Sequence, residues 1–328
     1  MSDLEQPINR KSFYSIIKNE NLIIEIPIIQ RDYAQGRTNI STSEVRSEFL
    51  TELKQYIDSN NENNDLDFVY GNIKDSPEGK VLILLDGQQR MTTLFLLHWY
   101  AALVAGESIF QSFREIMYDG ISSRFTYKTR YSSTDFCNHL VIFRREAKKG
   151  EIGESLVDYY NKKITLEKKI SSLIKNEKWF NAYWNEDPTI LSMLKMLDSI
   201  QEKFPKDEYK DLYQKLTGSE EKDPVITFQF LDLDKYELTD ELYIKMNSRG
   251  RPLTRYENLK SKLLGEYDSF SRTQNGAEFS NELKLNGIKL REYISNRFDK
   301  EWTDLFGICG WIIRMVLKHL LLTICLSV

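Results

Sequence analysis

The residues best suited to chemistry lie in one polar turn, residues 86–90 (DGQQR), between two apolar segments. Residues 81–85 form a continuous apolar run, which is typical of a strand buried on both faces. The run that follows, up to Val104, has the length of a buried helix. The turn is therefore expected where a strand ends and a helix begins. There, unpaired backbone N–H groups and the helix dipole favour an anion.

Each residue type in this turn suits part of a phosphate site. Gly87 permits close backbone approach, Arg90 can fork onto a phosphate, and Thr92 or Thr93 adds a hydroxyl. Asp86 can bind a hydrated metal ion, accept from a ribose hydroxyl or orient Arg90. The simpler alternative is that Asp86 caps the helix and pairs with Arg90, and the segment alone leaves both open. It is not a P-loop, because GxxxxGK[ST] is absent.

The elements that position this turn are expected to be a small sheet and a series of helices. Strands are expected at 22–26, 68–73, 81–85 and 225–233. Helices are expected directly after the turn and at 10–18, 41–58, 152–175, 188–204, 208–216, 239–247 and 255–267. Asp187 followed by Pro188 is typical of a helix N-cap and first helical residue. These patterns predict an α+β fold.

Four motif blocks follow one another along the chain. Residues 26–37 (IPIIQRDYAQGR) and 66–71 (LDFVYG) precede DGQQRMTTL, and residues 243–260 (YIKMNSRGRPLTRYENLK) follow it. Together the blocks resemble the N-terminal domain of the GmrSD-type restriction and phage-defence proteins, which look like relatives of the ParB and sulfiredoxin fold. That family commonly has a Trp shortly after QRxY, whereas here Tyr33 is followed by AQGR, which is typical of a subgroup.

The resemblance implies a ParB/sulfiredoxin-like small sheet with helices, elaborated by a predominantly helical region. It places a nucleotide-binding core in residues 1–120 and a mainly helical region that completes the site in 121–306, with a strand near 225–233 and the NSRG block at 247–250. The apolar tail, residues 307–328, is expected to be truncated or to be an interface helix.

For function, the resemblance implies binding and hydrolysis of a nucleoside triphosphate of unspecified base with Mg²⁺, coupled in the family to cleavage of foreign or modified DNA. Together with the residue types in the turn, it makes Asp86, Gln89 and Arg90 the catalytic candidates. Asp86 would be the metal ligand, and Gln89 or Gln88 would orient water. The nucleotide-binding candidates are Gln30, Arg31, Gly87, Gln88, Thr92, Asn247, Arg249 and Gly250.

Three functions follow. The first is an NTP-hydrolysing sensor region of a modification-dependent restriction or anti-phage system, whose effector nuclease lies in a further domain or subunit. The second is a regulatory module that binds nucleotide or DNA without hydrolysis. The third, a ParB-like phosphodiesterase, is disfavoured because the sequence near the turn has neither a carboxylate cluster nor metal-binding histidines.

Charge patterning adds a DNA expectation. Residues 124–149 and 245–262 each carry a net charge of +5, which leaves −14 for the remainder of a chain whose net charge is −4. Tyr127, Tyr131 and Phe136 interleave the first segment, a composition suited to phosphate contact and base stacking. Foreign or modified DNA is thus an expected partner, beside a nuclease subunit and a second copy of the chain.

The compartment is expected to be the cytoplasm. The first residues lack the apolar core of a signal peptide, and three cysteines without CxxC spacing suggest a reducing environment. The apolar tail contains Arg314 and Lys318 near its middle, each of which costs about 2.5–3.5 kcal/mol at a bilayer centre. A membrane span is therefore not expected.

Overall fold

The computed structural model describes residues 9–27, 33–37, 40–59, 64–77, 79–128, 130–142, 156–164, 168–219 and 222–233, and two short strands beyond them. The chain divides into two compact units, Met1–Ile244 and Lys245–Val328. In the second unit the described part is an antiparallel pair, β7 (Lys284–Leu285) and β8 (Ile288–Lys289). The helices expected at 239–247 and 255–267 and the tail at 307–328 lie outside the described residues.

The first unit is built on a six-stranded mixed sheet with the strand order β1-β6-β3-β4-β2-β5. Its strands are β1 (Asn9–Lys11), β2 (Ile23–Ile26), β3 (Asn64–Ser76), β4 (Gly79–Asp86), β5 (Phe125–Tyr127) and β6 (Ile226–Asp232). β4 pairs antiparallel with β3 and parallel with β2, and β2 pairs parallel with β5. The carboxyl ends of β2, β4 and β5 therefore lie at one edge of the sheet.

The central strand pair is uneven in length. Asp86, the last residue of β4, is opposite Tyr70 in the middle of β3, so residues 64–69 of β3 continue past the end of β4. On its other side β3 pairs in parallel with β6, with a register shift between Asp65 and Phe68. Among the described residues, one flank of β3 thus has no neighbouring strand where β4 turns into helix.

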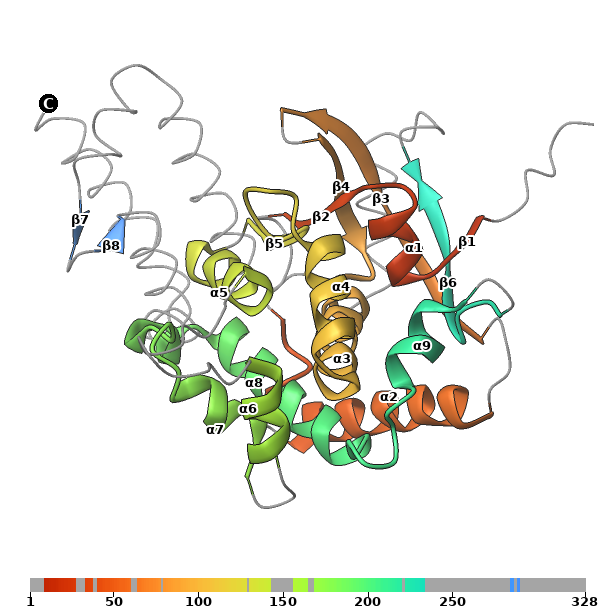
Figure 1. Cartoon of the computed structure of the whole chain (residues 1–328). Helices are drawn as coiled ribbons and strands as arrows, with labels where there is room; N and C mark the ends of the chain where they lie inside the picture. The colour runs from red at the N-terminus through yellow and green to blue at the C-terminus, as the bar shows by residue number, and fades with distance from the viewer. Residues whose placement is uncertain are drawn as a thin grey trace, which may run out of the picture. The chain divides into compact units, whose positions relative to one another are not determined.

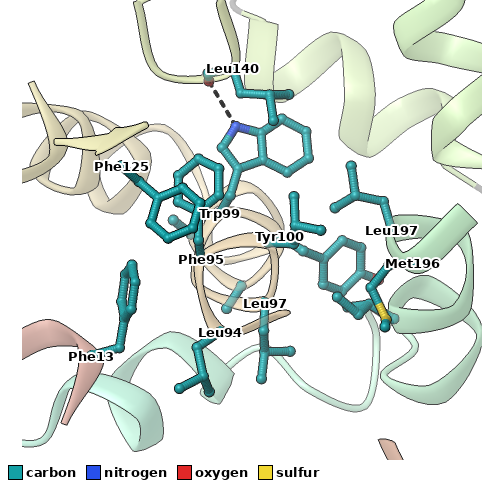
Figure 2. Close-up of a cluster of buried hydrophobic side chains, with 14 of the residues drawn as sticks. Phe13, Leu94, Phe95, Leu97, Trp99, Tyr100, Phe125, Leu140, Met196 and Leu197 are labelled. Atoms are coloured by element: carbon teal, nitrogen blue, oxygen red, sulfur yellow. Dashed lines mark hydrogen bonds between the residues drawn. The ribbon is translucent and has the colours of Figure 1, made fainter. Parts of the chain in front are cut away.

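A long buried helix, α3 (Gln88–Ala105), supports the sheet from the centre of the unit, with the strands above it and α2 and α8 below it in Figure 1. Its side chains from Met91 to Val104 are all buried, because α3 is enclosed on every side. Figure 2 shows these side chains radiating from α3, with Trp99 Nε1 donating to the carbonyl of Leu140 at 2.8 Å. Buried residues from Phe13 to Phe230 form one continuous core.

The other helices surround α3. Their bounds are α1 (Phe13–Lys18), α2 (Ile40–Ser59), α4 (Glu107–Met117), α5 (Tyr131–Ile142), α6 (Leu156–Lys163), α7 (Ile170–Lys175), the 3₁₀ turn η1 (Ala182–Glu186), α8 (Pro188–Lys203) and α9 (Leu212–Thr217). The predicted α+β fold is confirmed, as is the N-cap of α8: Asp187 accepts from the backbone N–H groups of Thr189 and Ile190. The ParB/sulfiredoxin likeness and the boundary at residue 120 stay predictions.

The helix predicted as one segment at 152–175 is wrong in its extent. The structure has two helices there, because side chains of α8 cap α7 separately. Gln201 Oε1 accepts from the N–H of Ile170 at 2.7 Å, and Asp198 Oδ1 accepts from the N–H of Ser171 at 3.0 Å. Among the described helices, none combines the length and apolarity that crossing a bilayer requires.

Candidate functional site

The strand-turn-helix expected at residues 86–90 is confirmed, and Gly87 is the residue that makes it. Its φ of +86° lies in the left-handed region, and a Cβ added there would be 2.8 Å from Val69 Cγ2. A side chain would therefore be strained by the backbone and blocked by β3. No described side chain caps α3. The alternative in which Asp86 caps the helix is wrong, although its pairing with Arg90 is present.

The next three residues, Gln88, Gln89 and Arg90, face three different parts of the surrounding structure. Successive residues of an α-helix are separated by about 100° around its axis. Gln88 lies on the face that packs towards β5, Gln89 contacts residues 33–37, and Arg90 contacts β3. The first turn of α3 is thereby fixed against the strands and the loop that surround it.

Gln88 has an unusual environment. Its side chain is 9% exposed, and its Oε1 is buried without a hydrogen-bond partner among the described residues. A buried polar atom without a partner is rare and costs about 1–3 kcal/mol in desolvation. This amide oxygen therefore lacks a described hydrogen-bond donor.

Thr92 lies one turn after Gln88 on the same face of α3. Its hydroxyl donates to the carbonyl of Gln88 at 2.7 Å and lies 2.5 Å from the hydroxyl of Tyr127, and the residue is fully buried. Its contacts hold the first turn of α3 against β5. Thr92 accordingly supports Gln88, and its expected part in nucleotide binding stays a prediction.

Gln89 contacts the segment that follows the QRDY motif. Its Oε1 accepts from the backbone N–H of Ala34 at 2.9 Å and from that of Gln35 at 3.4 Å. Arg46 holds the same segment from α2, donating to the carbonyls of Gln35 and Arg37, both at 3.0 Å. The backbone of the AQGR residues that depart from the family pattern is therefore held by α2 and α3, while Arg37 is exposed.

Arg90 occupies the flank of β3 that β4 leaves open. Its guanidinium donates to the carbonyls of Leu66 and Phe68, the latter at 2.7 Å. The carboxylates of Asp67 and Asp86 each lie 3.6 Å from it. With 20% of its side chain exposed, Arg90 replaces the missing strand and carries positive charge beside Asp86.

Asp86 ends β4 directly before the turn, and its side chain is 47% exposed. Asp67 lies beside the same guanidinium, with a φ of +62° that is uncommon for a residue with a side chain. Sequence reasoning missed Asp67; its only signal was its place in the LDFVYG block. No group of three or more His, Cys, Asp or Glu side chains could hold a metal among the described residues.

A second charged pair lies at the same sheet edge, where β2 and β5 end. Lys128 Nζ is 3.6 Å from Glu25 Oε2. The pKa of the Glu25 carboxyl lies above its usual value, because the effect of burial exceeds the opposing effect of Lys128. Lys128 is exposed and directly follows β5. This pair also was not singled out from the sequence.

The basic segment 124–149 is only partly available to DNA. Tyr127 and Phe136 are fully buried, so the stacking expected of their rings is not available. Arg130 is buried too, and its guanidinium pairs with Asp187 at 3.0 Å. Lys128 and Tyr131 are exposed, and residues 143–149 lie outside the described residues.

The remaining predicted site residues are not described. Gln30, Arg31, Asn247, Arg249 and Gly250 lie outside the described residues, so their place in the site stays a prediction. Leu231 of β6 is in register with Tyr70, which is opposite Asp86, so the chain leaves β6 level with the end of β4.

Comparison with known proteins identifies the family. The family model described as the GmrSD restriction endonuclease N-terminal domain matches residues 12–264, well over half of the chain. The match includes strands β2 to β6 of the sheet and the turn at residues 86–90. No curated protein matches the sequence. The chain therefore belongs to the GmrSD restriction endonuclease N-terminal domain family.

Proposed function

We propose that the chain is the part of a restriction or anti-phage defence system that binds and hydrolyses a nucleoside triphosphate as a sensor of modified DNA. The observation that carries the proposal is the buried, unpartnered Oε1 of Gln88 beside the amino end of α3. The helix N-terminus attracts phosphate, and the amide oxygen needs a donor. Ligands of open α/β sheets commonly bind at the carboxyl ends of parallel strands, where this turn lies.

Phosphoryl transfer to water needs positioning and charge stabilisation more than covalent chemistry. In this proposal the backbone N–H groups at the start of α3 bind the phosphates, and Gly87 lets them approach. Gln88 Oε1 accepts a hydrogen bond from the attacking water, leaving a lone pair of the water for attack. Arg90 supplies positive charge from a fixed position. It does not bind a phosphate through both terminal nitrogens, because these nitrogens donate to β3.

A magnesium ion fits Asp86 only as a shared ligand. Mg²⁺ is usually bound by one or two carboxylates together with substrate phosphates. The exposed Asp86 carboxylate provides one such oxygen, and Asp67 lies nearby. When bound, Mg²⁺ would neutralise charge on the phosphates, and Arg90 would orient the Asp86 carboxylate.

DNA contact belongs to the same proposal. Lys128 and Tyr131 lie beside the sheet edge that carries the turn, and residues 245–262 add a second basic segment. Lysines contribute salt-dependent phosphate contacts, and an exposed aromatic ring can stack on an unpaired base. The nuclease would reside in a further domain or subunit, and assembly into a homo-oligomer remains a prediction.

Hydrolysis of the four NTPs with Mg²⁺, with and without modified DNA, tests the function. We expect turnover of at least one NTP by the wild type, its loss in Asp86→Ala, and native-like circular dichroism of that variant. Normal turnover by folded Asp86→Ala would refute the assigned site. Calorimetric binding without product would select the non-hydrolysing module, and nicking of plasmid DNA with Mg²⁺ or Mn²⁺ by this chain alone would select the phosphodiesterase.

A further inference from the structure

We infer that Gln89 is a positioning residue: its side chain fixes residues 33–37 to the first turn of α3, and it does not orient the attacking water. The inference rests on the proposed function, because it concerns how the nucleotide site is built. Part of its test nevertheless needs no nucleotide.

The first step concerns the acceptor capacity of Gln89. A carboxamide oxygen has two lone pairs. Gln89 Oε1 receives the N–H of Ala34 at 2.9 Å and that of Gln35 at 3.4 Å, so both are directed to residues 33–37. Gln88 Oε1, one residue earlier, accepts from no described group. Of the two amide oxygens in the motif, that of Gln88 is the one whose acceptor capacity no described group uses.

The second step concerns the loop that Gln89 holds. The Thr93 hydroxyl, one turn further along α3, lies 2.7 Å from Gln35 Oε1 and 2.8 Å from the Tyr33 hydroxyl. Gly36 touches α8 so closely that an added Cβ would be 1.8 Å from the carbonyl oxygen of Ser192. Residues 33–37 are thus held by side chains of α3 and by direct packing on α8.

The third step is that Arg46 completes the arrangement from α2. Its side chain is buried and donates to the carbonyls of Gln35 and Arg37, and its other terminal nitrogen donates to Ser43 Oγ at 3.0 Å. Gln89 holds the N–H groups of the loop while Arg46 holds its carbonyls. If Gln89 acts by positioning, loss of Gln89 and loss of Arg46 must have the same consequence, although Arg46 lies outside the motif.

Trypsin cleavage after the exposed Arg37 measures release of this loop without any nucleotide. We expect Gln89→Leu and Arg46→Lys each to accelerate this cleavage about 5- to 30-fold, the effect of losing one or two such hydrogen bonds on a local opening equilibrium. The double variant should be cleaved more slowly than the product of the two single accelerations predicts, because Gln89 and Arg46 hold the same segment. Gln111→Leu, which removes a glutamine bound to Glu107 on α4, is the matched control and should leave the cleavage rate unchanged.

Nucleotide binding then separates positioning from contact. With β,γ-imido analogues of the four NTPs and Mg²⁺, Gln89→Glu should bind more tightly than Gln89→Leu, because it keeps the accepting oxygen. A side chain in contact with the triphosphate would give the reverse order, because the added negative charge repels it.

The inference is overturned if Gln89→Leu leaves cleavage after Arg37 unchanged, or if it keeps wild-type analogue affinity while turnover falls more than tenfold. If the wild type binds none of the analogues, the proposed nucleotide function fails. In that case the cleavage rates of the Gln89 and Arg46 single variants and of the double variant still test the positioning role.

Discussion

The guanidinium of Arg90 donates to the carbonyl oxygen of Phe68 at 2.7 Å, at the flank of β3 that β4 has already left. Leu66, two residues earlier, offers its carbonyl to the other terminal nitrogen of the same guanidinium. Carbonyls at such a position would normally be paired by the next strand. Arg90 therefore joins the end of the sheet to the first turn of α3.

Replacing Arg90 should destabilise the fold. Arg90→Ala leaves two backbone carbonyls without their donors, and we expect it to lower the free energy of unfolding by about 1–3 kcal/mol, with Arg90→Lys intermediate. Urea unfolding with an unchanged m-value measures the loss. Arg10→Ala, which removes an exposed ion pair with Asp65, is the matched control and should destabilise the protein less than Arg90→Ala. An Arg90→Ala protein as stable as the wild type would contradict the sheet-edge role.

Gly87 should tolerate no side chain. Gly87→Ala combines a positive φ with a contact of 2.8 Å to Val69, and we expect a loss of stability of about 1–3 kcal/mol. Gly79→Ala shares a positive φ but has open space around it, so it should be less destabilising. In a Val69→Ala background the cost of Gly87→Ala should fall, as thermal unfolding can show. Equal costs in both backgrounds would argue against the Val69 contact.

Stability should decline below neutral pH because of His98. Burial lowers the pKa of its imidazole from 6.5 to about 4, although hydrogen bonding to the Leu94 carbonyl opposes the shift. The unfolded chain binds this proton first, so stability is full above pH 6.5 and is lost as pH falls towards 4, by about 3 kcal/mol.

Urea unfolding between pH 4 and 7 tests this sign. His98→Gln should flatten the acid limb of the profile. His139 provides the opposite case, because its hydrogen bond to Asp135 raises its pKa, so its contribution is present below pH 6.5 and lost as pH rises. If His98→Gln loses as much stability at acid pH as the wild type, the acid sensitivity belongs to other groups.

Asp187 should be among the most sensitive positions of the fold. Its carboxylate accepts from Arg130 at 3.0 Å, from the hydroxyls of Ser132 and Ser133 at 2.6 and 2.8 Å, and from the amino end of α8. Asp187→Ala removes the carboxylate that pairs with the buried Arg130 guanidinium, and we expect a loss of about 3–5 kcal/mol by chemical denaturation. Lys128→Ala, which removes an exposed cation, is the control and should unfold like the wild type. A loss below that of Ser132→Ala would refute the predicted importance of this pair.

Parts of this site could be predicted because their causes are local. The apolar run before Asp86 and the long apolar segment after Arg90 predict the strand-turn-helix. Asp187 followed by Pro188 predicts the start of α8. The partners of the motif could not be predicted, because they come from distant segments. Gln89 meets Ala34 across 55 residues and Arg90 meets Phe68 across 22. The same holds for Arg130. Its charge predicts contact with solvent or DNA, whereas in the structure it pairs with Asp187.

The measurement that tests the account most directly is a comparison of the wild type with Gln88→Met in two experiments on the same preparation, urea unfolding and calorimetric binding of NTP analogues with Mg²⁺. Met keeps a similar volume and removes a buried amide oxygen that has no described partner. We predict that stability is unchanged or rises, by up to about 1–3 kcal/mol, because an unsatisfied polar atom is lost. We also predict that nucleotide binding falls at least tenfold. A protein that loses stability while it keeps wild-type nucleotide affinity would contradict the central claim that Gln88 is kept polar for its ligand.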